Sequence, residues 1–112
     1  MEITNEFDSI IEIYLYEINT YVEQLREGIL FLESNFSNQT LIQELNRIAH
    51  TLKASSRVYG YDEIQIAAQK LEEIFGNILN DNLNVNSALA KKLLIIIDSI
   101  SSAIDIIVQS KI

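Results

Sequence analysis

The chain has 112 residues and no proline, and this absence restricts its fold more than any other feature of the sequence. Proline punctuates loops and breaks helices, whereas sheets and turns usually recruit it. In the first third of the chain, apolar residues recur at alternating steps of four and three, a spacing typical of one helical face. The stripe comprises Phe7, Ile11, Tyr14, Ile18, Tyr21, Leu25, Gly28 and Leu32. It predicts a first helix that begins near Thr4 or Asn5, as a cap, and ends at about Glu33.

Three further helices are predicted on the same grounds, from about Gln39 to Val58, Asp62 to Leu79 and Ser87 to Gln109. Asn38 is the expected cap of the second helix, and Gly60 stops it because glycine readily takes the left-handed conformation that ends helices. The residues predicted to point inward are Leu41, Leu45, Ile48, Leu52 and Ser55; Ile64, Ala68, Leu71, Phe75 and Ile78; and Leu89, Leu93, Ile96, Ile100, Ala103 and Ile107, with Ile97, Ile104 and Val108 beside them.

Four amphipathic helices joined by short loops predict an all-α fold, an antiparallel up-down-up-down four-helix bundle. We expect residues 1–112 to form a single domain, because a chain this short holds one core and no second lobe. The first helix would span on the order of 40 Å at about 1.5 Å per residue. This is longer than a small bundle needs, so we expect the first helix to be extended past the bundle or bent.

Composition excludes several classes of function. Sixteen acidic and eight basic side chains give a net charge of −8 without a basic cluster, which argues against binding nucleic acid or an anionic membrane. The chain has no cysteine, and it does not open like a signal peptide. Its longest strongly apolar run, Leu93 to Ile97, is far short of the roughly 20 residues that cross a bilayer. We therefore expect a cytoplasmic protein whose partners are proteins.

No cofactor and no metal is expected in this domain. The three glycines are isolated, so the sequence has neither a Walker-type phosphate loop nor a kinase glycine-rich loop. A di-iron bundle needs Glu-x-x-His on two helices, whereas this chain has one histidine, with Arg47 three residues before it. We therefore expect no autonomous catalysis.

The single histidine, His50, lies in the middle of the second predicted helix. It lies some 140 to 160° from the apolar stripe at about 100° per residue, so it points outward. Its side of the helix also carries Asn46, Lys53, Ala54 and Arg57. Together these residues form a polar, basic and uncrowded strip on an otherwise acidic protein.

A register argument places an acid beside His50. If the turn at 59–61 closes an antiparallel helical hairpin, positions that sum to about 122 lie level, so His50 faces Glu72. By the same rule Lys53 lies level with Gln69, Arg57 with Gln65 and Asn46 with Gly76. A carboxylate that accepts a hydrogen bond from one imidazole nitrogen fixes the tautomer and raises the basicity of the other nitrogen. We therefore predict that Glu72 binds Nδ1 and leaves Nε2 exposed as a nucleophile, with Lys53 one turn on to neutralise an incoming phosphoryl group.

Simpler interpretations of the same residues stay open. Lys53 and Arg57 could be merely solvated, or Glu72 could pair with either of them for less than about 1 kcal/mol. Gln69 is then a neighbour without a role, and Ser55 and Ser56 are small packing residues. Gly60 is expected to be a helix stop, and Gly76 a point of close helix packing.

The run from His50 to Gly60, H-T-L-K-A-S-S-R-V-Y-G, resembles the signature of histidine-containing phosphotransfer (HPt) domains. That signature reads H-x-[LI]-K-[GA]-[SA]-[SA]-x-x-[aromatic or apolar]-G. The segments Leu25–Glu33, Leu45–Ala49 and Leu71–Glu72 look like the amino-terminal phosphotransfer domain of CheA-type chemotaxis kinases. The resemblance therefore covers nearly the whole chain.

The resemblance implies a role for each matching position. His50 matches the phosphorylated histidine, Lys53 the lysine beside it, and Glu72 the carboxylate that orients the imidazole in CheA-like domains. Ala54 stands where glycine is commonest and also leaves room for a partner to approach. Gln69 stands where several chemotaxis kinases have a second histidine, so any role of that second ring must be weaker or differently made here.

The expected function is that of a phosphotransfer module in a two-component, chemotaxis-type phosphorelay. His50 would accept a phosphoryl group from the ATP-binding domain of a histidine kinase, in the same polypeptide or in trans, or from a phosphorylated receiver. It would pass the group to an aspartate of a response-regulator receiver domain, and ATP and Mg²⁺ would belong to those partners. The alternative is a non-catalytic bundle for interaction or dimerisation, in which Ile66 and Ile106, off the main stripes, form an apolar patch.

Overall fold

The computed structural model describes residues 6–110. The expected cap at Thr4 or Asn5 and the side chain of Phe7 lie outside the described part of the chain. The order of elements is α1 (Glu6–Leu32), α2 (Gln39–Tyr59), α3 (Asp62–Leu79) and α4 (Ser87–Ser110). Each boundary that the sequence predicted within this range differs from the observed one by no more than a residue or two.

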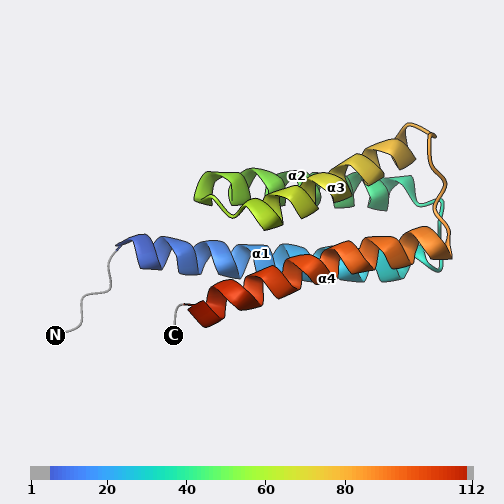
Figure 1. The fold of residues 1–112 in the computed structure, drawn as a ribbon. Coiled ribbons are helices and arrows are strands. Elements are labelled where there is room, and N and C mark those ends of the chain that lie inside the picture. The colour runs from blue at the N-terminus through green and yellow to red at the C-terminus, as the bar shows by residue number, and fades with distance from the viewer. Residues whose placement is uncertain (1–5, 111–112) are drawn as a thin grey trace.

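The four helices form the predicted antiparallel bundle, in which α2 and α3 make one hairpin that lies against the pair α1 and α4 (Figure 1). Each helix packs on its two neighbours in the order α1, α2, α3, α4 and back to α1. The bundle is elongated, with extents of 56 × 20 × 19 Å. The first turns of α1 extend beyond the turn between α2 and α3, so the long first helix overhangs the bundle as expected (Figure 1).

Hydrogen bonds at the ends of α2 fix where this helix begins and ends. The side chain of Asn38 accepts a hydrogen bond from the backbone N–H of Leu41 at 3.0 Å, as predicted for an N-cap. Gly60 has a φ of 78°, in the left-handed region, and its N–H donates to the carbonyl of Arg57. The N–H of Tyr61 donates to the carbonyl of Ser56, which completes a Schellman motif. Gly60 is therefore the helix stop that sets the α2–α3 turn.

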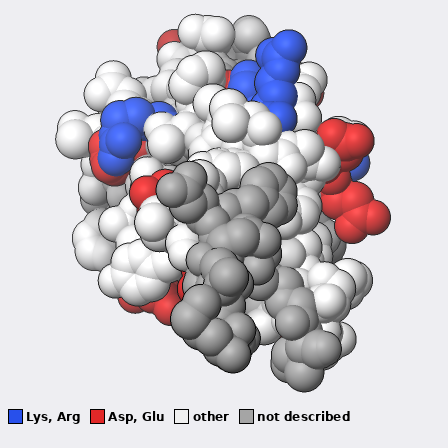
Figure 2. All heavy atoms as spheres, turned by 90° about the vertical axis from the view of Figure 1, so that its left-hand side faces the viewer, with Lys and Arg blue, Asp and Glu red and all other residues white. Residues whose placement is uncertain are grey.

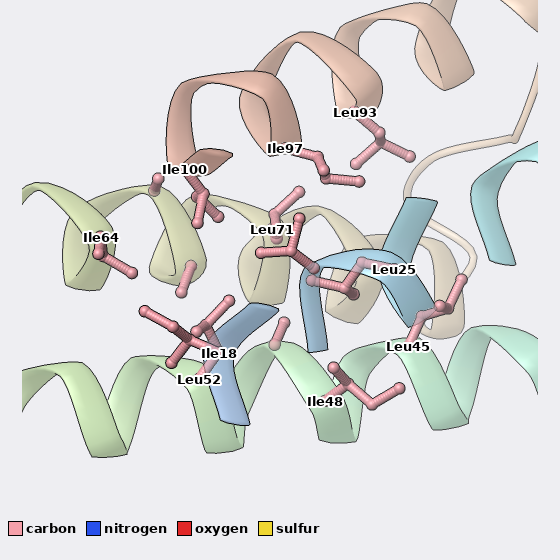
Figure 3. Packing of buried hydrophobic residues seen from close by; sticks show 14 of the residues in the cluster. Ile18, Leu25, Leu45, Ile48, Leu52, Ile64, Leu71, Leu93, Ile97 and Ile100 are labelled. Carbon is pink, nitrogen blue, oxygen red and sulfur yellow. The ribbon is translucent and has the colours of Figure 1, made fainter. Parts of the chain in front are cut away.

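The core is one apolar cluster to which all four helices contribute (Figure 3). The predicted inward residues of α3 are all buried, as are Leu45, Ile48 and Leu52 of α2. Two of the residues predicted on the inner face of α2, Leu41 and Ser55, are only partly buried. Their neighbours Ile42 and Ser56 are completely buried instead. At the exposed end of α4, Val108 faces solvent because fewer neighbouring helices reach that far.

A cluster of tyrosines ties α1 to the α2–α3 turn. The hydroxyls of Tyr14 and Ser56 share a hydrogen bond of 2.7 Å in the interior. The Tyr14 ring lies between Tyr59 and Tyr61, with centroid distances of 4.7 and 5.3 Å. Burial raises the pKa of Tyr14 to about 12. These contacts hold the hairpin at one height along α1.

Two glycines inside helices have opposite surroundings. A Cβ at Gly28 of α1 would overlap the side chain of Leu45, so this glycine allows α1 and α2 to approach closely. A Cβ at Gly76 of α3 would meet no atom within 4 Å. The expectation that Gly76 permits close helix packing was therefore wrong, because α2 leaves open space at that position.

Among the described residues, α4 is the one helix that is long and apolar enough, by length and composition, to cross a membrane. Its central apolar run, Leu93 to Ile97, is much shorter than the whole helix. In the bundle α4 packs against α1 and α3, and Leu93, Ile97 and Ile100 lie in the core. The core helix of a soluble protein can meet the same criterion, and 28% of the apolar window of α4 is buried inside the bundle. Ile66 of α3 and Ile106 of α4 are exposed, as the alternative interpretation expected.

Candidate functional site

His50 stands on the outer surface of α2, in the middle of that helix. Its side chain is 62% exposed. The apolar stripe of α2 turns inward toward the core, and this leaves the opposite, polar strip toward solvent beside α3. The prediction of an outward-pointing imidazole in mid-helix is confirmed.

Glu72 of α3 bridges His50 and Lys53 with its two carboxylate oxygens. The Nδ1 of His50 lies 2.5 Å from Oε2, and the Nζ of Lys53 donates to Oε1 at 2.5 Å. The side chains of Glu72 and Lys53 are only 22% and 27% exposed, so this contact lies in the seam between the two helices. The antiparallel register that predicted the pairing of His50 with Glu72 is confirmed.

The electrostatics of Glu72 favour its ionised form. Desolvation by itself raises the pKa of this carboxyl, but the hydrogen bonds from Lys53 and His50 outweigh it, and the pKa is lowered below its ordinary value of 4.5. At neutral pH Glu72 is therefore a carboxylate that accepts from the N–H at Nδ1 of His50. The unprotonated nitrogen of the neutral imidazole is then Nε2, on the far side of the ring from α3.

The sequence left two interpretations of Lys53 open, a solvated side chain or an ion pair with Glu72. The pairing rule placed Lys53 level with Gln69, but its ammonium reaches across to Glu72. Gln69 instead donates to Glu73 on its own helix at 3.2 Å. The ion pair between Lys53 and Glu72, which composition could not distinguish from a solvated lysine, is thus part of the structure.

The other predicted site residues lie at different distances from His50. Ala54 is exposed one turn after it, on the same strip. Arg57 is exposed two turns after it and forms no ion pair with any residue from 6 to 110. Gly60 acts only at the helix end, roughly 15 Å along the axis at 1.5 Å per residue. The structure brings together His50, Lys53 and Glu72, with Ala54 beside them.

The helix that carries His50 is net basic in an otherwise acidic molecule. On α2, Arg47, Lys53 and Arg57 outnumber the single acid Glu44, whereas α1 carries six acidic residues and one arginine. Both the Nε and Nη2 atoms of Arg47 bind the Glu44 carboxylate. At the end of the bundle where α1 begins and α4 ends, the described residues in view are mostly uncharged, with scattered basic and acidic groups at the rim (Figure 2). Within the described residues, no group of three or more His, Cys, Asp or Glu side chains could hold a metal ion.

Comparison with known proteins gives the same family as the signature around His50. The family model for the Hpt domain matches residues 9–103. The chemotaxis protein CheA of Borreliella burgdorferi is 30% identical over 113 residues, which cover all of this chain and 13% of that protein. The CheA of Halobacterium salinarum is 29% identical over 98 residues, covering 88% of this chain and 15% of that protein.

A solved structure agrees with these sequence relatives. The CheA phosphotransferase domain from Thermotoga maritima superimposes with a TM-score of 0.84 at 28% identity, covering 89% of this chain and 95% of that domain. The chain thus spans a small part of the full-length relatives but nearly all of a structure solved as one domain.

Proposed function

Because this chain belongs to the Hpt family and has the fold and sequence of the phosphotransfer domain of a CheA-type chemotaxis phosphorelay, we propose that His50 carries the phosphoryl group on Nε2. The observation that supports this assignment is the contact between Nδ1 of His50 and Glu72. It holds the ring by one nitrogen and leaves the other facing solvent.

Attack by this tautomer needs no base. The lone pair of Nε2 attacks phosphorus, the Nε2–P bond forms, and the bond from phosphorus to the leaving group breaks with its electron pair. The proton on Nδ1 stays in place, and the positive charge that develops on the ring lies against the Glu72 carboxylate. In the return step a receiver aspartate attacks the phosphorus, and the electron pair of the Nε2–P bond returns to the ring.

Lys53 and Glu72 act together in this proposal. Glu72 fixes the orientation and tautomer of His50, and Lys53 holds the second oxygen of Glu72 so that the carboxylate cannot rotate away. The ammonium of Lys53 also places positive charge within one turn of the phosphoryl group. Arg57 extends the positive strip, and exposed Ala54 leaves space for a second protein.

The exposure of His50 supports the inference that partner proteins supply the remaining chemistry. The donor is the ATP-binding domain of a histidine kinase, in the same polypeptide or in trans, or a phosphorylated receiver. The acceptor is the aspartate of a response-regulator receiver domain. ATP and Mg²⁺ belong to those partners, so the domain acts as a carrier in a soluble, cytoplasmic signalling system and needs neither nucleic acid nor a membrane surface. Its own contribution is to present the imidazole in a fixed orientation.

Incubation with a cognate kinase domain and radiolabelled ATP tests the assignment. We expect acid-labile, base-stable label on the parent chain and none on His50→Gln, with unchanged circular dichroism. Equal labelling of His50→Gln would refute the assignment of His50. Glu72→Ala should fold normally and label more slowly, and unchanged kinetics would remove Glu72 from the mechanism.

A non-catalytic interaction module is the second candidate, and the exposed Ile66 and Ile106 are the observation that favours it. Such a module would carry no phosphohistidine under the same conditions. Sedimentation of the unlabelled chain at increasing concentration would then show self-association, which the carrier function does not require.

A further inference from the structure

Asn46 is the one residue of the described chain with a buried side-chain polar atom that lacks a hydrogen bond. Its Oδ1 is enclosed and has no partner. Its amide nitrogen also has no partner among the described residues, but it is not enclosed as the oxygen is. A buried acceptor without a partner destabilises a fold, so a half-buried asparagine at a helix seam needs an explanation that packing does not supply.

The position of Asn46 relates it to the phosphoryl site. It lies one turn before His50 on the same strip of α2, and side chains four residues apart on a helix are neighbours. Helical side chains lean toward the N-terminus, so the imidazole of His50 leans over the turn that carries Asn46. In the register fixed by His50 and Glu72, Asn46 lies level with Gly76, where an added Cβ would meet nothing. The space beside Gly76, at the height of Asn46, is therefore open.

The hydrogen bonds around His50 leave Asn46 as the available donor. Lys53 lies one turn after His50, whereas Asn46 lies one turn before it. The ammonium of Lys53 already donates a hydrogen bond to Glu72, and a contact with a phosphoryl oxygen would weaken this bond between Lys53 and Glu72. Arg57 lies two turns away, in the direction opposite to the lean of the ring. The amide N–H groups of Asn46 can donate without breaking any hydrogen bond within the domain.

We propose that the carboxamide of Asn46 is a phosphoryl-contact group, which donates a hydrogen bond from Nδ2 to an oxygen of the phosphoryl group on Nε2 of His50. This inference rests on the proposed function of His50. The uncharged amide of Asn46, one turn before His50, then helps to orient the phosphoryl group and to stabilise its negative charge, together with Lys53 one turn after His50. The buried oxygen without a partner is then the cost of holding the amide in the seam.

Phosphoramidate, a small phosphoryl donor, tests this without a kinase. Nε2 attacks its phosphorus, the phosphorus–nitrogen bond of the donor breaks, and ammonia leaves. The rate of labelling is measured by ³¹P NMR for the parent, Asn46→Leu, Asn46→Ala and the control Gln43→Leu, which alters an exposed amide one turn earlier. Thermal unfolding is measured on the same samples.

We expect both Asn46 variants to label about three- to tenfold more slowly, the effect of losing one hydrogen bond of ordinary strength. Gln43→Leu should label like the parent. Asn46→Leu should unfold at a higher temperature than the parent, because it removes the buried oxygen. A merely structural asparagine would give the reverse pattern, with lower stability and unchanged chemistry.

Parent-like rates in both Asn46 variants would overturn the inference while leaving the function of His50 intact. A slower rate found only in variants that also unfold at lower temperature would overturn it as well, because the amide would then act through the fold. Failure of the parent itself to label on His50 would instead refute the proposed function.

Discussion

The same substitution, glycine to alanine, should have opposite effects at Gly28 and Gly76. Alanine is favoured over glycine inside a helix by about 0.5–1 kcal/mol, and this gain applies at both sites. At Gly76 nothing lies within 4 Å of the added Cβ, so the gain stands undiminished. Gly76→Ala should therefore raise the free energy of unfolding by about 0.5–1 kcal/mol.

At Gly28 the added carbon would overlap the side chain of Leu45, a core residue that is only 1% exposed. Overpacking of this kind costs about 1–3 kcal/mol. After subtraction of the helical gain, Gly28→Ala should lower the free energy of unfolding by up to about 2.5 kcal/mol, with a central value of about 1 kcal/mol. The two variants should then differ by about 2 kcal/mol, although they carry the same chemical change.

Urea denaturation followed by circular dichroism measures both values. With a slope of about 1–2 kcal/mol per molar urea, the two midpoints should lie about 1 M or more apart, on either side of the parent. Equal slopes would show that the unfolded states are comparable. A Gly28→Ala variant at least as stable as the parent would refute the close packing of α1 on α2. A Gly76→Ala variant less stable than the parent would refute the open space beside Gly76 on α3.

Three further outcomes are expected. Tyr14→Phe should lower the free energy of unfolding by about 1–2 kcal/mol, because it leaves the buried Ser56 hydroxyl without a partner, and Tyr14→Phe/Ser56→Ala should recover part of the loss in thermal melts. Ultraviolet titration should show one tyrosine, Tyr14, that ionises only near pH 12. Stability should fall as the pH rises above 10.0, the ordinary pKa of tyrosine, because the unfolded chain ionises there first. A parent chain in which all tyrosines titrate together would contradict this. The stability that Glu72 contributes should be complete above pH 4.5, its ordinary value, and lost as the pH falls through its lowered folded-state pKa, so Glu72→Gln should flatten the acid side of the stability profile; an unchanged profile would count against the bridge.

Helix boundaries could be predicted from the sequence because local chemistry sets them. Asn38 caps α2 with its own side chain, and Gly60 ends α2 in a conformation that few other residues adopt. The pairing of His50 with Glu72 followed from the turn and from the constant rise of a helix, which together fix which residues lie level.

Details that depend on side-chain direction were harder to predict. Ser55 and Ser56 follow Leu52 by three and four residues, so both fit the spacing of the inner face; Ser56 is the buried one, and its hydroxyl shares a hydrogen bond with Tyr14. Lys53 has a long, flexible side chain, so its level along the helix did not predict that it would bind Glu72 instead of lying beside Gln69. Gly76 looked like a packing glycine because the sequence does not reveal how far α2 stands from it.

The openness of His50 also determines how signals can pass through this domain. Under the proposed function, the ring on the outside of the helix, more than half exposed, is a single binding site that the phosphoryl donor and the acceptor protein would occupy in turn. The two partners then bind in sequence, because they cannot contact His50 at the same time. The partner that dissociates more slowly then limits the rate of phosphoryl transfer. The residence time of each partner at α2 should therefore govern signalling speed more than the chemical step at the nitrogen does.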